Sequence, residues 1–454
     1  MSTRGSFVSK RAPPALVAAA LLAPLVMLPL LVRPELGIGA AAAAVALLLA
    51  WVSPAYPLGL SGLGALVPLA GPVDLPDRAV VTALFAWMVA GILFAVIRRP
   101  DRAALPMVIA IPVLLSLALF AIMLLRLTGS PAESLGSDKV QLFLTVNLVA
   151  LVGGVLVGRH RRDLELCLTL MVVVAVLGAV GLLVELMGGT EPVYPGRYGL
   201  SGDNPITLGR ITAAGLLIAT YALFTAGAAV RSLALCTIPV LAVAFFASGS
   251  RGPFVGLLCG LIVFGGLMAR ERRLGGRWPL VLGGIVLAVL GASHLVPGDA
   301  MNRAAGILVG GESGLDTTGR AELWADAWRT FLDHPELGVG TGGFASVDPL
   351  NAFPHNLLLE AGAEWGLLGL VPLLGVLGVG VAKMAEAVRR PPHGEGALAA
   401  LVTALFTAAL VNAMVSGDIT TNSDVWLTLG LGLGLASRAL PRTASAQGSA
   451  GSNP

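Results

Sequence analysis

Long apolar runs separated by short polar connections make up most of this chain. The runs are each close to the length of a membrane-spanning helix and lie near residues 15–32, 37–53, 57–71, 79–97, 104–126, 139–158, 165–187, 206–229, 233–249, 253–268, 279–296, 357–382, 398–416 and 425–437. Crossing a bilayer takes about 20 residues, within a range of about 17–25. The runs at 57–71, 253–268 and 425–437 are short and are open to re-entrant, broken or tilted arrangements. The pattern predicts an all-α fold, a polytopic membrane helical bundle with 12–14 transmembrane helices.

One polar segment, residues 297–356, is far longer than most other connections. Within it, apolar positions recur at helical spacing over 319–333, which predicts an amphipathic helix lying on the membrane surface. Long loops of this kind are where functional side chains concentrate. We expect four parts: an N-terminal transmembrane bundle (1–296), a large extracytoplasmic loop (297–356), C-terminal transmembrane helices (357–437) and a disordered cytoplasmic tail (438–454).

Composition agrees with a membrane protein and narrows its partners. Of 454 residues, 56% are hydrophobic and 12% are charged. A soluble domain of this length has no means of burying so much apolar surface. The net charge of +3 is too small to indicate nucleic-acid binding. All three cysteines fall in apolar runs and no nucleotide-binding fingerprint precedes a soluble helix, so we expect no disulfide, no metal site and no cofactor.

Loop charge predicts the orientation in the membrane. Basic clusters occur at the N-terminus and at 98–102, 159–162, 270–273 and 389–390, and the predicted spans put all of them on one side. Because basic loops stay in the cytoplasm, both termini are expected there and segment 297–356 on the outer face of the cytoplasmic (inner) membrane. The N-terminal apolar run lacks a clear cleavage site, so we interpret it as a retained helix and not as a signal peptide.

Arginines occur on the predicted outer side, where loop basicity is usually low. Arg197 and Arg210 belong to YPGRYGLSGDNPITLGR, and Arg210 lies about one turn inside an apolar run. A charge at that depth faces a partner or a wet cavity, or else snorkels to the interface. In SGSRGPF a tight turn explains the Gly and Pro but not Arg251. Arg320 begins the helix 319–333, where the helix dipole disfavours a cation unless an anion is bound.

The end of the long loop carries a second group of candidates, in PHNLLLEAGAEW. His355 and Asn356 stand where the chain re-enters the membrane, followed by Glu360 and Glu364 near the top of the next helix. A lone histidine is more often an ordinary polar residue, but this one lies at the mouth of a helix with two carboxylates. Those carboxylates need partners inside the membrane, and we expect the outer-side arginines to provide them.

These motifs resemble the signature of the O-antigen ligase/O-antigen polymerase superfamily. They are, in order, the SGSRG turn, Arg320-Ala-Glu-Leu-Trp324, then Phe331-x-x-His334-Pro335-x-x-Gly338-x-Gly340-x-Gly342-x-Phe344, His355-Asn356-x-x-Leu359-Glu360, and Glu364-x-Gly366-x-x-Gly369. The resemblance covers residues 190–370 by motif and the whole chain by topology. It implies a metal-independent glycosyltransferase of the C type. It also implies that Arg197 or Arg210, with Arg251 and Arg320, binds the donor diphosphate and that His355 is catalytic.

The resemblance further implies that a glycan moves from an undecaprenyl-diphosphate carrier to an acceptor hydroxyl. The acceptor would be lipid A–core in a ligase and another glycan in a polymerase. Arginine forks suit the charge that develops on a departing diphosphate, and a histidine suits the acceptor hydroxyl as a positioning group or base. No enzyme nucleophile is evident, so inversion is expected. Two alternatives stay open: a multi-span transporter or lipid-glycan flippase, which would explain intramembrane charge, and a peptidoglycan-type polymerase, which fits the motifs less well.

Overall fold

We analysed a computed structural model of the chain, which describes residues 34–61, 77–98, 107–200, 204–270, 295–309, 319–348, 351–392 and 394–438. The described elements are helical, apart from one isolated bridge between Tyr194 and Arg197. The helices are α2 (Pro34–Val52), α3 (Ala55–Ser61), α5 (Asp77–Arg98), α6 (Met107–Leu125), α7 (Glu133–Leu142), the π-helix η3 (Phe143–Leu148), α8 (Val149–Gly158), α9 (Arg161–Met187), α10 (Pro205–Thr225), α11 (Ala228–Ala247), α12 (Arg251–Arg270), α14 (Gly298–Val309), α15 (Arg320–Asp333), the 3₁₀ helix η7 (Gly343–Ser346), α16 (Leu357–Arg389), α17 (Gly396–Ala413) and α18 (Ser423–Ser437). The predicted all-α membrane bundle is confirmed.

Within the described residues, seven helices are long and apolar enough to cross a membrane, or eight if the bent pair Ala43–Val52 and Ala55–Ser61 is one span. That pair bends by 117° at the break. The predicted runs at 15–32 and 279–296 lie outside or almost wholly outside the described residues. Helices α5 and α6 contribute shorter apolar stretches, Thr82–Arg98 and Ile109–Leu125. The span count of 12–14 and the four-part division therefore stay predictions.

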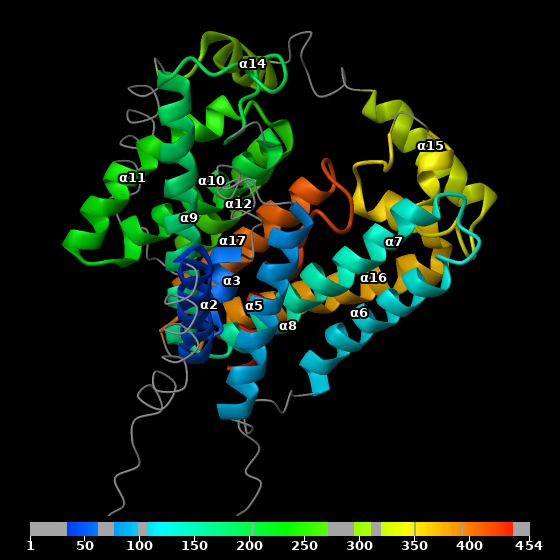
Figure 1. The fold of residues 1–454 in the computed structure, drawn as a ribbon, viewed down its shortest axis with the longest axis horizontal. Helices are drawn as coiled ribbons and strands as arrows, with labels where there is room; N and C mark the ends of the chain where they lie inside the picture. The colour runs from blue at the N-terminus through cyan, green and yellow to red at the C-terminus, as the bar shows by residue number, and fades with distance from the viewer. Residues whose placement is uncertain are drawn as a thin grey trace, which may run out of the picture.

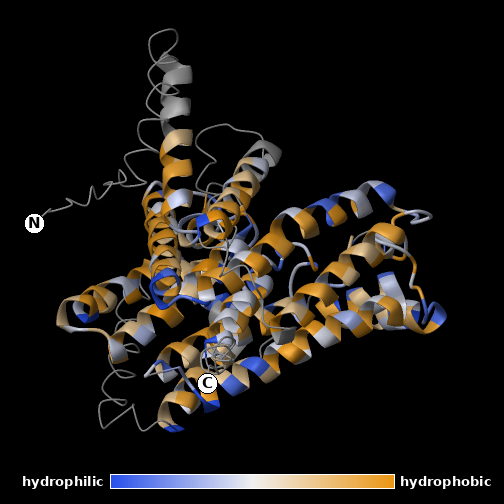
Figure 2. Ribbon diagram, turned by 90° about the horizontal axis from the view of Figure 1, so that it is seen from below, coloured by the Kyte–Doolittle hydropathy of each residue, from blue (hydrophilic) through white to orange (hydrophobic). Residues whose placement is uncertain are grey.

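The helices form two groups joined by a central layer (Figure 1). On one side lie α9, α10, α11, α12 and α14, and on the other α6, α7, α15 and α16, with α17 and α8 between them. Apolar residues cover most of the helices, while hydrophilic residues gather mainly towards helix ends and loops (Figure 2). This distribution suits elements surrounded by lipid along their length and by water at their ends.

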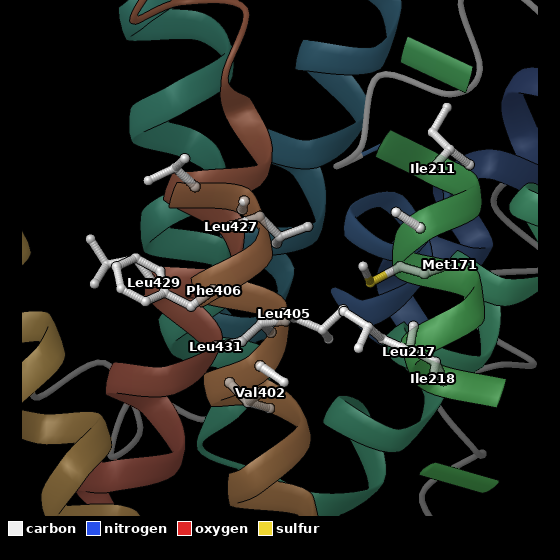
Figure 3. Packing of buried hydrophobic residues seen from close by; sticks show 14 of the residues in the cluster. Met171, Ile211, Leu217, Ile218, Val402, Leu405, Phe406, Leu427, Leu429 and Leu431 are labelled. Atoms are coloured by element: carbon white, nitrogen blue, oxygen red, sulfur yellow. The ribbon is translucent and has the colours of Figure 1, made fainter. Parts of the chain in front are cut away.

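Small residues allow the central helices to approach closely. An added Cβ on Gly256 of α12 would lie 2.6 Å from the Ala408 carbonyl oxygen of α17, and one on Gly154 of α8 would lie 2.7 Å from the Leu427 oxygen of α18. Such packing is how helices associate in lipid, where burial of apolar surface gives little driving force. Figure 3 shows side chains such as Leu217, Leu405 and Leu427 in the resulting core.

The described part of the long loop 297–356 contains the α-helices α14 and α15 and the 3₁₀ helix η7. The predicted amphipathic helix at 319–333 is confirmed as α15, whose buried residues Leu323 and Ala327 pack with Phe344 and Ala363. The sequence pattern did not identify α14. After α15, the chain passes through three glycines in the left-handed region, Gly338, Gly340 and Gly342.

These glycines let the loop join α16 at a break in that helix. Gly366 has φ 58° and ψ −153°, which interrupts the helical hydrogen bonds. Leu367 and Leu368 donate instead to the carbonyls of loop residues 335 and 336, while the carbonyls of 363 and 364 accept from Val339 and Gly340 at 2.9 Å. A broken helix in a membrane requires such replacement partners for its freed backbone groups. The loop end is thereby fixed to the start of α16.

Candidate functional site

Four arginines from four separate segments converge at one end of the bundle. Arg197 lies in the α9–α10 connection, Arg251 begins α12, Arg303 lies in α14 and Arg320 begins α15. The Arg303 Nε donates to the Gly249 carbonyl at 3.1 Å, and an Arg197 Nη2 lies 3.4 Å from the Ser250 hydroxyl. We call these four residues the arginine cluster.

Their mutual electrostatics show how close the guanidinium groups are. Burial and then the charge of Arg303 lower the pKa of Arg197 to about 10, with smaller contributions from Arg320 and Arg251 and an opposing effect of Tyr194 that is weaker than that of Arg303. Burial and the charges of Arg251 and Arg303 also lower the pKa of Arg320. Like charges disfavour one another's ionised form, so the cluster is held together at an electrostatic cost.

Three of the four cluster arginines, Arg197, Arg303 and Arg320, have no ion pair among the described residues. Those described residues also contain no group of three or more His, Cys, Asp or Glu side chains placed to hold a metal ion. Arg197, Arg303 and Arg320 are half-buried and have no carboxylate partner among the described residues, an arrangement that suits a multivalent anion such as a diphosphate.

Gly249 explains why these segments meet where they do. It has φ 53°, and an added Cβ would contact the Gly196 carbonyl and lie 3.1 Å from Arg197 Cγ and 3.2 Å from Arg303 Cδ. Only a residue without a side chain fits between the three segments. The Tyr198 hydroxyl lies 3.3 Å from Asp299 Oδ1 and helps to dock α14 here. Arg303 was missed by sequence analysis because α14 itself was missed; an amphipathic pattern over 298–309 was the available signal.

His355 stands beside the cluster in a strained backbone conformation. Its φ is 55°, and it is the one described non-glycine residue in the left-handed region. Its Nδ1 accepts a hydrogen bond from the Gly417 amide at 3.2 Å. Burial, then the charge of Arg320, lowers the pKa of His355 to about 4. At neutral pH the imidazole is therefore uncharged, and because Nδ1 is an acceptor, the hydrogen-bond network assigns the proton to Nε2.

Two neighbours fix the segment around His355. Trp324 of α15 donates from Nε1 to the Pro354 carbonyl at 3.0 Å, which ties the helix of Arg320 to the histidine. Asn356 caps α16 by accepting from the amides of Leu358 and Leu359 at 3.1 Å, and it donates to the Met414 carbonyl at 3.0 Å. Asn356 thus positions the backbone next to His355, as an N-cap does.

Arg210 lies apart from the cluster. It donates to the carbonyls of Thr421 at 2.7 Å and Ser416 at 3.4 Å, in the α17–α18 connection. Its donors are therefore largely used by the protein itself. Of the two alternatives in the sequence analysis, Arg197 joins Arg251 and Arg320, whereas Arg210 holds the connection that carries Gly417, the partner of His355.

The prediction that arginines pair with Glu360 and Glu364 was wrong. Neither carboxylate pairs with an arginine of the predicted outer side; both accept from Lys139 Nζ of α7 at 2.6 Å. Lys139 is 2% exposed and both glutamates are 0% exposed. The sequence gives no local signal for this buried triad, because Lys139 is 221 residues from Glu360 in the chain. A buried charge needs such a partner, and here it comes from a distant helix.

The buried triad also holds two backbone segments of the site. Glu364 Oε2 accepts from the Gly342 amide at 2.8 Å, at the end of the glycine-rich loop segment. Glu360 Oε2 accepts from the Ile419 amide at 2.9 Å, and the Ile419 carbonyl accepts from Asn147 at 2.8 Å. Because residues 417–422 include the amide bonded to His355, Glu360 helps to position that histidine.

Comparison with known proteins agrees with this arrangement. Residues 236–374 match the family model described as O-Antigen ligase, a range that includes Arg251, Arg303, Arg320, His355 and both glutamates. The chain is 26% identical over 317 residues to an O-antigen ligase of Pseudomonas aeruginosa, a match that covers 68% of this chain and 74% of that protein. Residues 236–374 therefore match the O-antigen ligase family, and the chain is a multi-pass membrane protein for which this match supports a general function in glycan transfer.

Proposed function

We propose that this protein transfers a glycan from an undecaprenyl-diphosphate carrier to an acceptor hydroxyl on the outer face of the cytoplasmic membrane. In this proposal it acts as an O-antigen ligase with lipid A–core as acceptor, without a metal ion and with inversion at the anomeric carbon. The single observation that carries the proposal is the arginine cluster next to His355. The ligase assignment also draws on the relative named an O-antigen ligase.

The arginine cluster suits the donor's leaving group. As the bond between the anomeric carbon and the diphosphate oxygen breaks, negative charge grows on the diphosphate. Guanidinium groups already fixed in place stabilise that charge without having to reorganise. Arg197, Arg251, Arg303 and Arg320 are each anchored by their own segment, and three of those segments meet at Gly249.

His355 suits the acceptor hydroxyl as a positioning group. With Nδ1 bonded to Gly417, the imidazole presents Nε2–H and lacks the free lone pair that a base requires there. A hydrogen bond from Nε2 to the acceptor oxygen would hold that oxygen opposite the leaving diphosphate. Alignment of this kind accounts for large rate effects, since a misplacement of about 1 Å costs about a hundredfold.

The alternatives predict different behaviour. A polymerase would use the same donor but join it to another glycan, so the acceptor separates it from a ligase. A transporter or flippase would need a sealed compartment to move its substrate, whereas a glycosyltransferase acts without one.

The test is turnover by purified protein in detergent, with a lipid-linked glycan and either lipid A–core or free glycan as acceptor. The proposal predicts glycan joined to lipid A–core in the absence of any gradient and in the presence of EDTA. Product on free glycan alone would identify a polymerase. Activity that is lost with EDTA and restored by Mg²⁺ or Mn²⁺ would refute metal independence, and movement of lipid-linked glycan only in sealed vesicles would favour a transporter.

A further inference from the structure

A groove of about 330 Å³ lies between the C-terminal turns of α12 and α16, at the helix ends opposite to Arg251 and His355. Its walls come from the last two turns of α12 and α16, and α17 packs between these helices as its floor. We call this cavity the lipid-side groove; it is lined by Val263, Leu267, Arg270, Val381, Met384, Ala385, Val388, Arg389, Thr403, Phe406, Thr407, Leu410 and Val411.

The interior of the lipid-side groove is apolar. Its two threonines, Thr403 and Thr407, donate their hydroxyls to helix carbonyls at 2.8 and 2.9 Å, so these donors are satisfied within the helix. Thr403, Thr407 and Leu410 are only half-buried, although their helix α17 packs between α12 and α16. The groove leaves this part of α17 uncovered. The floor from Thr403 to Val411 spans about 12 Å at 1.5 Å per residue, close to the roughly 15 Å of hydrocarbon in one leaflet.

Two cations stand at one end of this apolar cavity. Arg270 is in the last turn of α12 and Arg389 in the last turn of α16, and both side chains line the groove. Both are exposed, and neither forms an ion pair with another described residue. Glu386, one turn before Arg389, is already paired with Lys383 at 2.6 Å. The groove therefore combines an apolar slot with a positive rim.

The lipid-side groove is separate from the glycan-transfer site. Arg251 begins α12 and Arg270 ends it, so these two arginines are about 28 Å apart along a helix that rises 1.5 Å per residue. His355 and Arg389 likewise flank opposite ends of α16. A donor whose diphosphate sits at the arginine cluster cannot also place that group between Arg270 and Arg389.

We propose that the lipid-side groove binds one anionic phospholipid, with its phosphate between Arg270 and Arg389 and one acyl chain on the α17 floor. The chemistry of the occupant follows from the cavity: a hydrocarbon chain fits the apolar slot, and an anionic headgroup complements the two arginines. Basic pockets between membrane helices bind anionic headgroups in this way. The bound lipid would fill the space between α12 and α16, which α17 alone does not cover.

Native mass spectrometry tests this with purified protein incubated with phosphatidylglycerol or with phosphatidylcholine of the same chains. We expect phosphatidylglycerol to be retained in preference to phosphatidylcholine. The double variant Arg270→Gln/Arg389→Gln should weaken phosphatidylglycerol binding by about thirtyfold, at the usual contribution of a basic residue near an anionic lipid. Both residues are exposed, so the fold should be retained, which thermal unfolding of the variant checks.

Two further variants separate the groove from general surface charge. Thr407→Trp fills the slot and should reduce phosphatidylglycerol binding with both arginines present. Arg161→Gln removes an exposed arginine of α9 that pairs with Glu165 and does not line the groove, and it should bind lipid as the unmodified chain does. Equal retention of the two lipids, unchanged binding by the double variant or by Thr407→Trp, or an equal loss in Arg161→Gln would each overturn the proposal. None of these results depends on glycan transfer.

Discussion

Replacing Lys139 by methionine tests the buried triad most sharply. Methionine keeps the length of the side chain but removes the ammonium group that bonds Glu360 and Glu364 at 2.6 Å. The two carboxylates, both 0% exposed, would then face each other without a cation. Removing one partner of a buried ion pair typically costs about 3–5 kcal/mol, because the remaining charge is not compensated. We expect a loss of stability of about this size.

The assay is unfolding in mixed micelles, with the free energy of unfolding compared between variants. A triple variant, Lys139→Met/Glu360→Gln/Glu364→Gln, is the matched control. Its amides can still accept from the Ile419 and Gly342 backbone, and no buried charge is left unpaired. We therefore expect it to recover most of the lost stability, as replacement of a complete buried ion set often does. A single variant within about 1 kcal/mol of the unmodified chain, or a triple variant no better than the single one, would refute this reasoning.

Three other predictions follow from separate features. Gly340→Ala should destabilise the chain by about 1–2 kcal/mol in the same unfolding assay, because Gly340 has φ 97°; an unchanged free energy would mean that the loop is not held in this conformation. The folded-state pKa of His355, about 4, lies below the ordinary histidine pKa of 6.5, so the unfolded state binds the proton first as the pH falls. The contribution of His355 to stability should be constant above pH 6.5 and fall as the pH drops from 6.5 towards 4, and His355→Gln should lack this fall. NMR titration of the imidazole measures its pKa directly, and a value near 6.5 would contradict the burial of His355. A cysteine replacing Ser313 should be labelled from outside intact cells and one replacing Leu274 should not, and the reverse pattern would overturn the predicted orientation.

The sequence predicts the helical elements well because their signal is local. Apolar runs mark most of the helices, and the spacing of Leu323, Ala327 and neighbouring apolar residues marks α15. Three of the four arginines of the cluster were also found, since Arg251 and Arg320 are unusual for their surroundings on the side predicted to face outward. A charge that the local pattern does not explain is visible without any knowledge of the fold.

The partners of these residues were not predictable, because they come from distant segments. Lys139 is an ordinary lysine by its local sequence, and its pairing with Glu360 depends on α7 lying against the top of α16. Arg303 joins the cluster only because α14 docks at Gly249. Gly338, Gly340 and Gly342 form a motif that is visible in the sequence. They let the loop bond across the break in α16 at Gly366, and only the three-dimensional structure reveals that break.

The central claim is that the arginine cluster binds the donor diphosphate while His355 acts on the acceptor. It is tested most directly by measuring donor affinity and turnover for purified variants in detergent. Arg251→Ala and Arg320→Ala should each weaken donor binding and slow transfer by about ten- to a hundredfold, from the 1.5–3 kcal/mol of a charge-assisted hydrogen bond. His355→Ala should lower turnover by about a hundredfold with donor binding nearly intact. Arg329→Ala, at an exposed arginine of α15 paired with Asp326, is the control and should change neither quantity. Loss of donor binding in His355→Ala, with both quantities unchanged in the two cluster variants, would contradict the account.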